Sequence, residues 1–265
     1  MKYRILICAI LKDETPYLIE WIEHHLKIGI EHFVLYDNNS AIPAKQTLDA
    51  YVKKGIVEVF DCKITNTPQL KVYTNCLYSM HDDTDWIAFI DIDEFIVLKK
   101  HNDIHSFLWD YKNFAGVCLN WLIYSANNHV SRPEGPVMQN YTEPTPPNFT
   151  ANSHVKSIVR PRYVNIMDSS HFARYAKNYC AVNEKYELVS RAHSPFSNDI
   201  AQINHYFTKS FEEWLDKIGR GIADSNGIRK VDEFWLYNPG LLPRKAEIEM
   251  RYKEAIERIN RLRTE

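Results

Sequence analysis

The chain has 265 residues, 45% of them hydrophobic, which is enough for one domain with a full core or for one domain and a small lobe. Its 32 basic and 34 acidic side chains leave a formal net charge of −2, which argues against a nucleic-acid-binding protein because those usually carry a basic excess. The five cysteines are dispersed and form no CxxC pair, so zinc-site spacing is absent and reduced thiols in a cytosol are expected.

The first half of the chain alternates predicted strands with predicted helices. Strands are expected at residues 4–10, 32–36, 56–60, 86–90 and 116–120. Helices are expected at about 15–29, 44–54, 70–80 and 104–111. This alternation predicts an α/β fold with a mostly parallel sheet and helices on both faces. Ligands of such sheets bind beyond the carboxyl ends of the strands, so the residues that follow each strand become candidate site residues.

The second half is less regular. Periodicity fails from about Ser125 to Ser153, where Pro, Asn, Ser and Thr are frequent, and a loop of this length is usually functional or mobile. Short strands are expected at 155–160 and 163–167, a helix at 208–219, and one long charged amphipathic helix at 244–263. We therefore expect one domain over residues 1–240, divided near residue 122, and a charged C-terminal helix within residues 241–265.

The most informative motif is Asp91-Ile92-Asp93-Glu94, which follows the apolar run Trp86–Ile90. Such a run is typical of a strand buried on both faces, and the i, i+2 spacing points both aspartates the same way. Two such carboxylates can hold a hard divalent cation while a diphosphate supplies further ligands. This indicates an enzyme whose leaving group is a nucleoside diphosphate. Asp83-Thr84-Asp85 has the same spacing but precedes the strand, and we expect a solvated loop there.

Two other predicted strands also end in polar residues. Asp37 begins Asp37-Asn38-Asn39-Ser40, where it could accept a hydrogen bond from a nucleoside base or ribose, or could serve only as a turn acid. Lys12 and Glu14 follow the first strand and are either site residues or ordinary charges at a helix start.

His205 lies in Ile203–Ser210, directly before a predicted helix. The imidazole could complete a metal site, and Lys209 near a helix N-terminus suits phosphate. The alternative is a helix capped by Thr208, with His205 as a loop residue. Lys156 is a further source of positive charge. The sequence has no GxGxxG, no GxxxxGK[ST] and no GxSxG, which argues against a glycine-rich phosphate loop and against a serine hydrolase of the usual kind.

Taken together, four blocks of this sequence resemble glycosyltransferase family 92 and its relatives in family 2. The blocks occur in the same order over roughly residues 5–221: Glu20–His25 with Gly29, His32–Ser40, Asp85–Phe95, and Ile203–Ser210 with Arg220-Gly221. The resemblance implies a GT-A fold, that is a Rossmann-like α/β sheet, with a long acceptor-side loop region. It also implies a nucleotide-sugar donor, often UDP-galactose, a divalent metal, and inversion at the anomeric carbon.

The resemblance also implies roles for individual residues. Asp91, Asp93 and His205 are expected to hold Mn²⁺ or Mg²⁺. The nucleotide sugar is expected in residues 1–122 and the acceptor in 123–240. The residues expected to bind the donor are Leu11, Lys12, Glu14, Asp37, Asn38, Ser40, Gln69, Asn75, Asp91, Ile92, Lys156 and Lys209. The base that deprotonates the acceptor is expected to be Glu134 in the long loop or Glu94 beside the metal acids, with an exposed turn residue as the alternative interpretation of Glu134.

These expectations describe a hexosyltransferase that moves galactose or another hexose from a UDP-sugar to a glycan or glycolipid acceptor. Eukaryotic members carry a membrane anchor before this domain, whereas here the domain starts at residue 1, so we expect a bacterial enzyme of surface polysaccharide or lipopolysaccharide synthesis. A cytoplasmic location is expected, with association at the inner membrane face as an open alternative. The competing functions are a sugar-nucleotide pyrophosphorylase, which normally has a glycine-rich loop after the first strand, and a non-catalytic nucleotide-sugar-binding module, which would gain nothing from buried acids.

Overall fold

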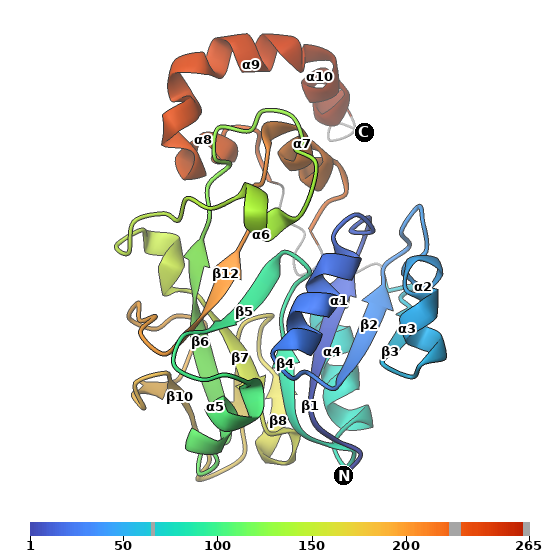
Figure 1. Ribbon diagram of the computed structural model, residues 1–265, viewed down its shortest axis with the longest axis vertical. Coiled ribbons are helices and arrows are strands. Elements are labelled where there is room, and N and C mark those ends of the chain that lie inside the picture. The colour runs from blue at the N-terminus through green and yellow to red at the C-terminus, as the bar shows by residue number, and fades with distance from the viewer. Residues whose placement is uncertain (65–66, 223–228, 262–265) are drawn as a thin grey trace.

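The computed structural model describes residues 1–64, 67–222 and 229–261, and a single ten-stranded sheet dominates it (Figure 1). Its strands are β1 (Tyr3–Leu11), β2 (His32–Asp37), β3 (Val57–Asp61), β4 (Thr84–Phe89), β5 (Glu94–Leu98), β6 (Gly116–Ile123), β7 (Val155–Val159), β10 (Ala181–Asn183), β11 (Leu188–Val189) and β12 (Ala201–His205). A separate hairpin joins β8 (Val164–Met167) to β9 (Ala173–Tyr175).

The main sheet has the order β11-β10-β6-β7-β4-β1-β2-β3, and β12 branches from β6 to pair with β5. Strands β3, β2, β1 and β4 are parallel, as are β6, β10 and β12, whereas β7 runs antiparallel between β4 and β6. The predicted α/β class with a mostly parallel sheet is therefore confirmed.

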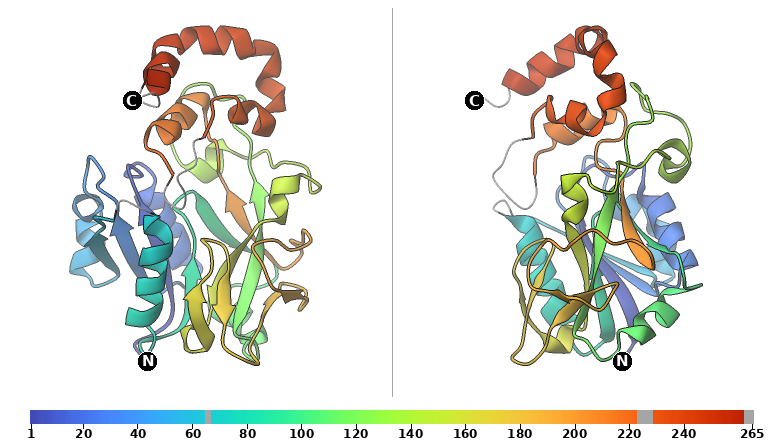
Figure 2. Two further views of the ribbon diagram at one scale, coloured as in Figure 1. Left: turned by 180° about the vertical axis from the view of Figure 1, so that it is seen from behind. Right: turned by 90° about the vertical axis from the view of Figure 1, so that its left-hand side faces the viewer.

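Helices cover both faces of the sheet. The described helices are α1 (Leu18–Lys27), α2 (Ala44–Thr47), α3 (Asp49–Lys53), α4 (Pro68–Ser79), α5 (Ile104–Asp110), α6 (Val137–Asn140), α7 (Phe211–Gly219), α8 (Glu233–Tyr237), α9 (Lys245–Arg251) and α10 (Lys253–Arg261). Short 3₁₀ turns lie at Thr150–Ser153, Pro161–Tyr163 and Pro239–Arg244. Figure 2 shows α4 on the face of the sheet opposite to α1.

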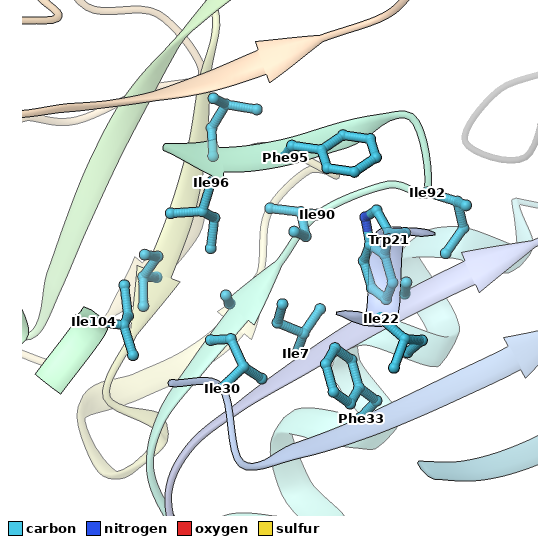
Figure 3. Close-up of a cluster of buried hydrophobic side chains, with 14 of the residues drawn as sticks. Ile7, Trp21, Ile22, Ile30, Phe33, Ile90, Ile92, Phe95, Ile96 and Ile104 are labelled. Carbon is cyan, nitrogen blue, oxygen red and sulfur yellow. The ribbon is translucent and has the colours of Figure 1, made fainter. Parts of the chain in front are cut away.

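Side chains of β1 alternate between the two faces of the sheet, which explains why helices cover both faces. Ile5, Ile7 and Ala9 pack into the core beneath α1 and α5. Figure 3 shows Ile7 in this core near Trp21 and Phe33. Leu6, Cys8 and Ile10 point the other way and pack with α4. Because successive side chains of a strand alternate between faces, a continuous apolar run is needed to bury β1 on both sides.

Trp21 links the first helix of the fold to the acidic motif. Its side chain is fully buried, and its indole N–H lies 2.8 Å from the carbonyl oxygen of Glu94 and 3.1 Å from that of Asp91. Trp21 of α1 therefore stabilises the turn that carries the two aspartates by hydrogen bonds to its backbone carbonyls.

Several expected elements differ in the structure. Thr84 and Asp85 belong to β4 rather than to a solvated loop, because Thr84 pairs in register with Tyr3 and is fully buried. No strand is expected from local pattern at β5 or β12, which pair with each other. The helix expected at 208–219 begins at Phe211 and is capped by Ser210, not by Thr208.

The single helix expected at 244–263 is two helices, α9 and α10, interrupted at Tyr252, and residues 262–265 lie outside the described residues. The Tyr252 ring packs 5.5 Å from the Phe211 ring, and its hydroxyl lies 3.1 Å from that of Ser131. Both helices share an apolar core with α7, in which Trp214, Ile248 and Ile259 are buried. The division of the chain at residue 240 stays a prediction. Within the described part of the chain, no helix is both long and apolar enough to cross a bilayer.

Trp21→Phe should lower the free energy of unfolding by about 2–4 kcal/mol, because it removes the indole N–H that the carbonyls of Glu94 and Asp91 accept from and opens a small cavity. Urea unfolding at equilibrium measures the change. Trp109→Phe is the control, since Trp109 is 66% exposed, and it should shift stability by no more than about 0.5 kcal/mol. Equal losses in the two variants would contradict the role given to the Trp21 indole.

Candidate functional site

A cleft of about 180 Å³ opens beyond the carboxyl ends of β1 and β4, on the side of the sheet where α7 and the C-terminal helices lie (Figure 1). Among the residues predicted from sequence, those that line it are Leu11, Lys12, Glu14, Asn38, Gln69, Asp91, Ile92, Asp93 and His205. The lining also contains Arg220 from the last block of the resemblance, and the structure adds Trp121, His171, Phe207, Lys217 and Arg229. The cleft is thus formed by both halves of the chain.

Three side chains donate hydrogen bonds to the carboxylate of Asp91. Its Oδ1 accepts hydrogen bonds from Gln69 Nε2 at 2.6 Å and from the Tyr73 hydroxyl at 3.1 Å, and its Oδ2 accepts from Lys156 Nζ at 2.8 Å. Burial alone would raise the pKa of Asp91, but the Lys156 ammonium holds it below its usual value, so the carboxylate stays ionised. Lys156 lies on β7, is buried, and also approaches Glu94 Oε2 at 3.5 Å.

Asp93 faces a different cation. Its Oδ2 accepts a hydrogen bond from Lys217 Nζ at 2.5 Å and lies 3.6 Å from His205 Nε2. Burial would raise the pKa of Asp93, but Lys217 and His205 outweigh burial and lower it well below its usual range. Burial lowers the pKa of His205, so its imidazole is neutral at pH 7, and its buried Nδ1 has no hydrogen-bond partner within the described part of the chain.

The strand β12 explains why His205 lies here. His205 pairs directly with Glu94 of β5, and the N–H of Tyr206 donates to the carbonyl oxygen of Asp93 at 2.9 Å. On its other side His205 pairs with Ile123 of β6. Two neighbouring strands therefore fix the imidazole beside the second aspartate of the motif.

These residues fit a divalent cation in part. Asp93 and His205 converge as a carboxylate and a neutral imidazole, a combination that suits Mn²⁺. Asp91 fits less well, because both of its oxygens already accept from Gln69, Tyr73 and Lys156. Among the residues described, no group of three or more His, Cys, Asp and Glu side chains is arranged to hold a metal. Most of the ligands would have to come from a diphosphate and water.

The two residues expected to supply the base lie away from the lining of this cleft. Glu94 is fully buried, its Oε2 accepts from the N–H of Asp91 at 2.9 Å, and burial raises its pKa to about 8. Glu134 is exposed in the turn before α6, where its carbonyl accepts from Asn140 Nδ2. Glu94 is positioned to support the Asp91–Asp93 turn, and the position of Glu134 matches the exposed-turn alternative. The assignment of either as the base gains no support from these positions.

At the end of β1, Glu14 pairs with Arg220 from the C-terminal side of α7, and the Arg220 guanidinium also donates to the carbonyl of Asp13. Glu14 and Arg220 both line the cleft, and so does Lys12. The charges that follow β1 therefore border the cleft, and their role as site residues stays a prediction.

Asp37 lies at the end of β2 in a second hollow next to the cleft. Its carboxylate accepts from the backbone N–H groups of Ser40 at 2.9 Å and Ala44 at 2.7 Å, so it organises the turn, as the turn-acid alternative predicts. Its contact with a nucleoside stays a prediction. The hollow is lined by Asp37, Asn38 and Ser40 and shares Lys12 and Arg220 with the cleft.

Five residues expected to bind the donor lie outside the lining of the cleft. Asp37 and Ser40 line the second hollow instead, whereas Asn75, Lys156 and Lys209 line neither, and Lys156 lies behind the cleft as the partner of Asp91. Asn75 is exposed on α4 and donates to the Tyr36 hydroxyl at 3.0 Å. Lys209 is buried, and its ammonium lies 4.3 Å from the centroid of the Tyr17 ring. Their assignment to the donor gains no support from these positions.

Lys217 is the main site residue that sequence reasoning missed. In α7 it follows Trp214 by three positions, so it lies on the same buried face as Trp214 and Ile218. A lysine on the apolar face of an amphipathic helix needs an acidic partner, and that signal was available in the sequence. Trp121 and His171 had no such signal, because strand β6 and the loop before β9 carry no motif there.

Comparison with curated proteins gives distant relatives, all from plants. A glycosyltransferase family 92 protein of Ricinus communis is 21% identical over 239 residues, covering 84% of this chain and 38% of the relative. One from Arabidopsis thaliana is 22% identical over 243 residues, with the same two coverages. The Arabidopsis galactan beta-1,4-galactosyltransferase GALS2 is 27% identical over 126 residues, covering 43% of this chain and 24% of that protein. The chain thus spans well under half the length of these relatives.

Solved structures with a similar fold include S. aureus TarS (residues 1–349) in complex with UDP-GlcNAc, at a TM-score of 0.40 and 12% identity over 97% of this chain and 79% of that one. Glucosyl-3-phosphoglycerate synthase from Mycobacterium tuberculosis, in complex with Mn²⁺, UDP-glucose and phosphoglyceric acid, has a TM-score of 0.32 and 13% identity over 45% of this chain and 44% of that one. These similarities are too distant to position individual side chains.

The sequence model of glycosyltransferase family 92 matches residues 4–239, which is most of the chain. Together with the mainly parallel sheet, this match confirms the expected GT-A fold. The chain belongs to glycosyltransferase family 92.

Proposed function

We propose that this chain is a metal-dependent, inverting glycosyltransferase domain that moves a hexose from a UDP-sugar to a glycan or glycolipid acceptor. One observation carries the proposal: Asp93 and His205 converge in a cleft that also presents Lys12, Lys217 and Arg220. Paired acids beside several cations suit a nucleoside diphosphate bound with a divalent cation, because the cations neutralise the phosphates.

In this proposal Asp93 and His205 hold Mn²⁺, or Mg²⁺, together with oxygens of the diphosphate. The metal would stabilise the negative charge that develops on the departing UDP. Lys217, Arg220 and Lys12 add further positive charge along the same wall, and Asp91 is held by Gln69 and Lys156 so that it faces the cleft. Charge that is fixed before the reaction stabilises the transition state without reorganisation.

The nucleoside would occupy the second hollow, beside Asp37 and Asn38. Asp37 already accepts from Ser40 and Ala44. Each carboxylate oxygen has two lone pairs, so it retains capacity for a uracil or ribose donor. Because Lys12 and Arg220 border both hollows, one UDP could extend from the Asp37 side to Asp93.

The finer details stay predictions. The partial similarity to a galactan galactosyltransferase supports galactose as the transferred hexose. The expected bacterial surface-glycan pathway and cytoplasmic location have no support in the relatives reported above, which are plant proteins.

Asp93→Asn should reduce UDP release from a UDP-hexose at saturating Mn²⁺ by about 100-fold or more, because it removes a metal ligand. Asp85→Asn is the matched control: Asp85 lies near the start of β4, whereas Asp93 follows the end of that strand, and Asp85 does not line the cleft. Its activity should stay within about twofold of wild type. Near-normal turnover in Asp93→Asn would contradict the proposed function.

Asp37→Asn should raise the donor KM about tenfold and change kcat little, because a contact to the nucleoside is equally strong in the ground state and the transition state. Steady-state kinetics with a UDP-hexose separate the two parameters. Asp61→Asn is the control, since Asp61 is an exposed acid that lines the same hollow. A large loss of kcat with an unchanged donor KM in Asp37→Asn would exclude the nucleoside role.

A further inference from the structure

The contact between Lys217 and Asp93 conflicts with metal binding at Asp93. Lys217 Nζ donates to Asp93 Oδ2 at 2.5 Å, and this is the same oxygen that approaches His205 Nε2. A cation held between Asp93 and His205 would lie against the ammonium group. Like charges at such a distance repel strongly in a buried site, so the lysine and the metal cannot both use this oxygen.

Lys217 is held in place by more than this ion pair. Its ammonium also donates to the carbonyl of Phe207 at 2.7 Å and lies 4.3 Å from the centroid of the Phe207 ring. The helix that carries it is anchored by a capping box in which Ser210 and Glu213 exchange hydrogen bonds. Lys217 is therefore a built-in cation of the site rather than a surface lysine that happens to reach it.

The net charge of the cleft lining also disfavours binding of a metal ion alone. Its described lining has four cationic side chains (Lys12, Lys217, Arg220 and Arg229) and three anionic ones (Glu14, Asp91 and Asp93), a formal balance of +1. A divalent cation that entered alone would add to a positive charge. A diphosphate that entered with it would offset both the metal and the lysine.

We propose that Lys217 is the internal counter-ion of Asp93 and exchanges its partner when the donor binds. Before binding, Lys217 occupies Asp93. When UDP and metal arrive together, the ammonium moves from Asp93 to the diphosphate, and Asp93 becomes free to join His205 on the metal. The flexible four-carbon stem of lysine allows such a shift from a fixed helix, and Lys217 already lines the cleft. This inference rests on the proposed function, and it gives Lys217 a positioning role that controls the order of binding.

The experiment measures equilibrium binding of Mn²⁺, without substrate and without turnover, by titration calorimetry in the absence and presence of UDP. Wild type should bind Mn²⁺ weakly alone and much more tightly with UDP. Lys217→Met should bind Mn²⁺ alone about tenfold or more tightly than wild type, because Asp93 is released and one repelling charge is lost. Its UDP affinity should fall, so the gain in Mn²⁺ affinity on adding UDP should shrink.

Two further variants separate the ion pair from other effects. Lys217→Gln keeps a hydrogen-bond donor for Asp93 and for the Phe207 carbonyl, so it preserves the fold if Lys217→Met does not, and it should also bind Mn²⁺ alone more tightly than wild type. Lys12→Met removes a positive charge from the same cleft without touching Asp93, and its affinity for Mn²⁺ alone should change only about twofold.

The outcomes are distinct. Tighter binding of Mn²⁺ alone by the Lys217 variants, but not by Lys12→Met, supports the exchange. Unchanged or weaker binding in the Lys217 variants overturns it and leaves the metal site of the proposed function standing. An equal gain in Lys12→Met also overturns it, because general electrostatics would then be the cause. No Mn²⁺ binding by any of these proteins, with or without UDP, overturns the proposed metal site and the exchange with it.

Discussion

Ion pairs between acids of the first half and cations of the second half are the constraint on which the rest of the site depends. Asp91 pairs with Lys156, Asp93 with Lys217, and Glu14 with Arg220. Each acid follows a strand of the parallel sheet, and each cation comes from β7 or from the C-terminal side of α7. Removing one partner of a buried pair commonly costs about 3–5 kcal/mol, so these contacts bind the two halves together as well as shaping the cleft.

The strand β12 also joins the two halves of the chain, through backbone hydrogen bonds. It pairs with β5 on one side and with β6 on the other. Because β5 begins at Glu94, this pairing places the segment that ends at His205 directly beside the acidic motif. Trp21 secures the opposite side of the motif through the carbonyls of Asp91 and Glu94. The carboxylates are therefore positioned by rigid elements on both sides, which suits a site that must stabilise developing charge without rearranging.

Much of the first half could be predicted from sequence, because β1, β2 and β4 are largely apolar runs and the polar residues that follow them collect at one edge of the sheet. This pattern singles out Asp91 and Asp93, which line the cleft, and Asp37, which lines the neighbouring hollow. The strand β5 could not be predicted because it starts within the acidic motif itself. The strand β12 could not be predicted because three of its five residues, Gln202, Asn204 and His205, are polar. Tyr252, where the C-terminal helix is interrupted, packs against Phe211, a contact between distant segments that no local pattern encodes. Lys217 and Asp93 are separated by 124 positions, so only the folded chain shows that they meet.

The surroundings of Trp121 give the chain an optical property. Its indole lies 4.3 Å from the ring of His205, and the rings of His154 and His171 lie 4.8 and 5.0 Å away. Indole fluorescence responds to charge, protonation and paramagnetic ions at this range. Trp121 is half-buried and lines the cleft, so an ion or ligand bound at His205 would lie within the range at which it should alter the emission of this indole. Occupancy of the cleft is therefore open to observation in the unlabelled protein.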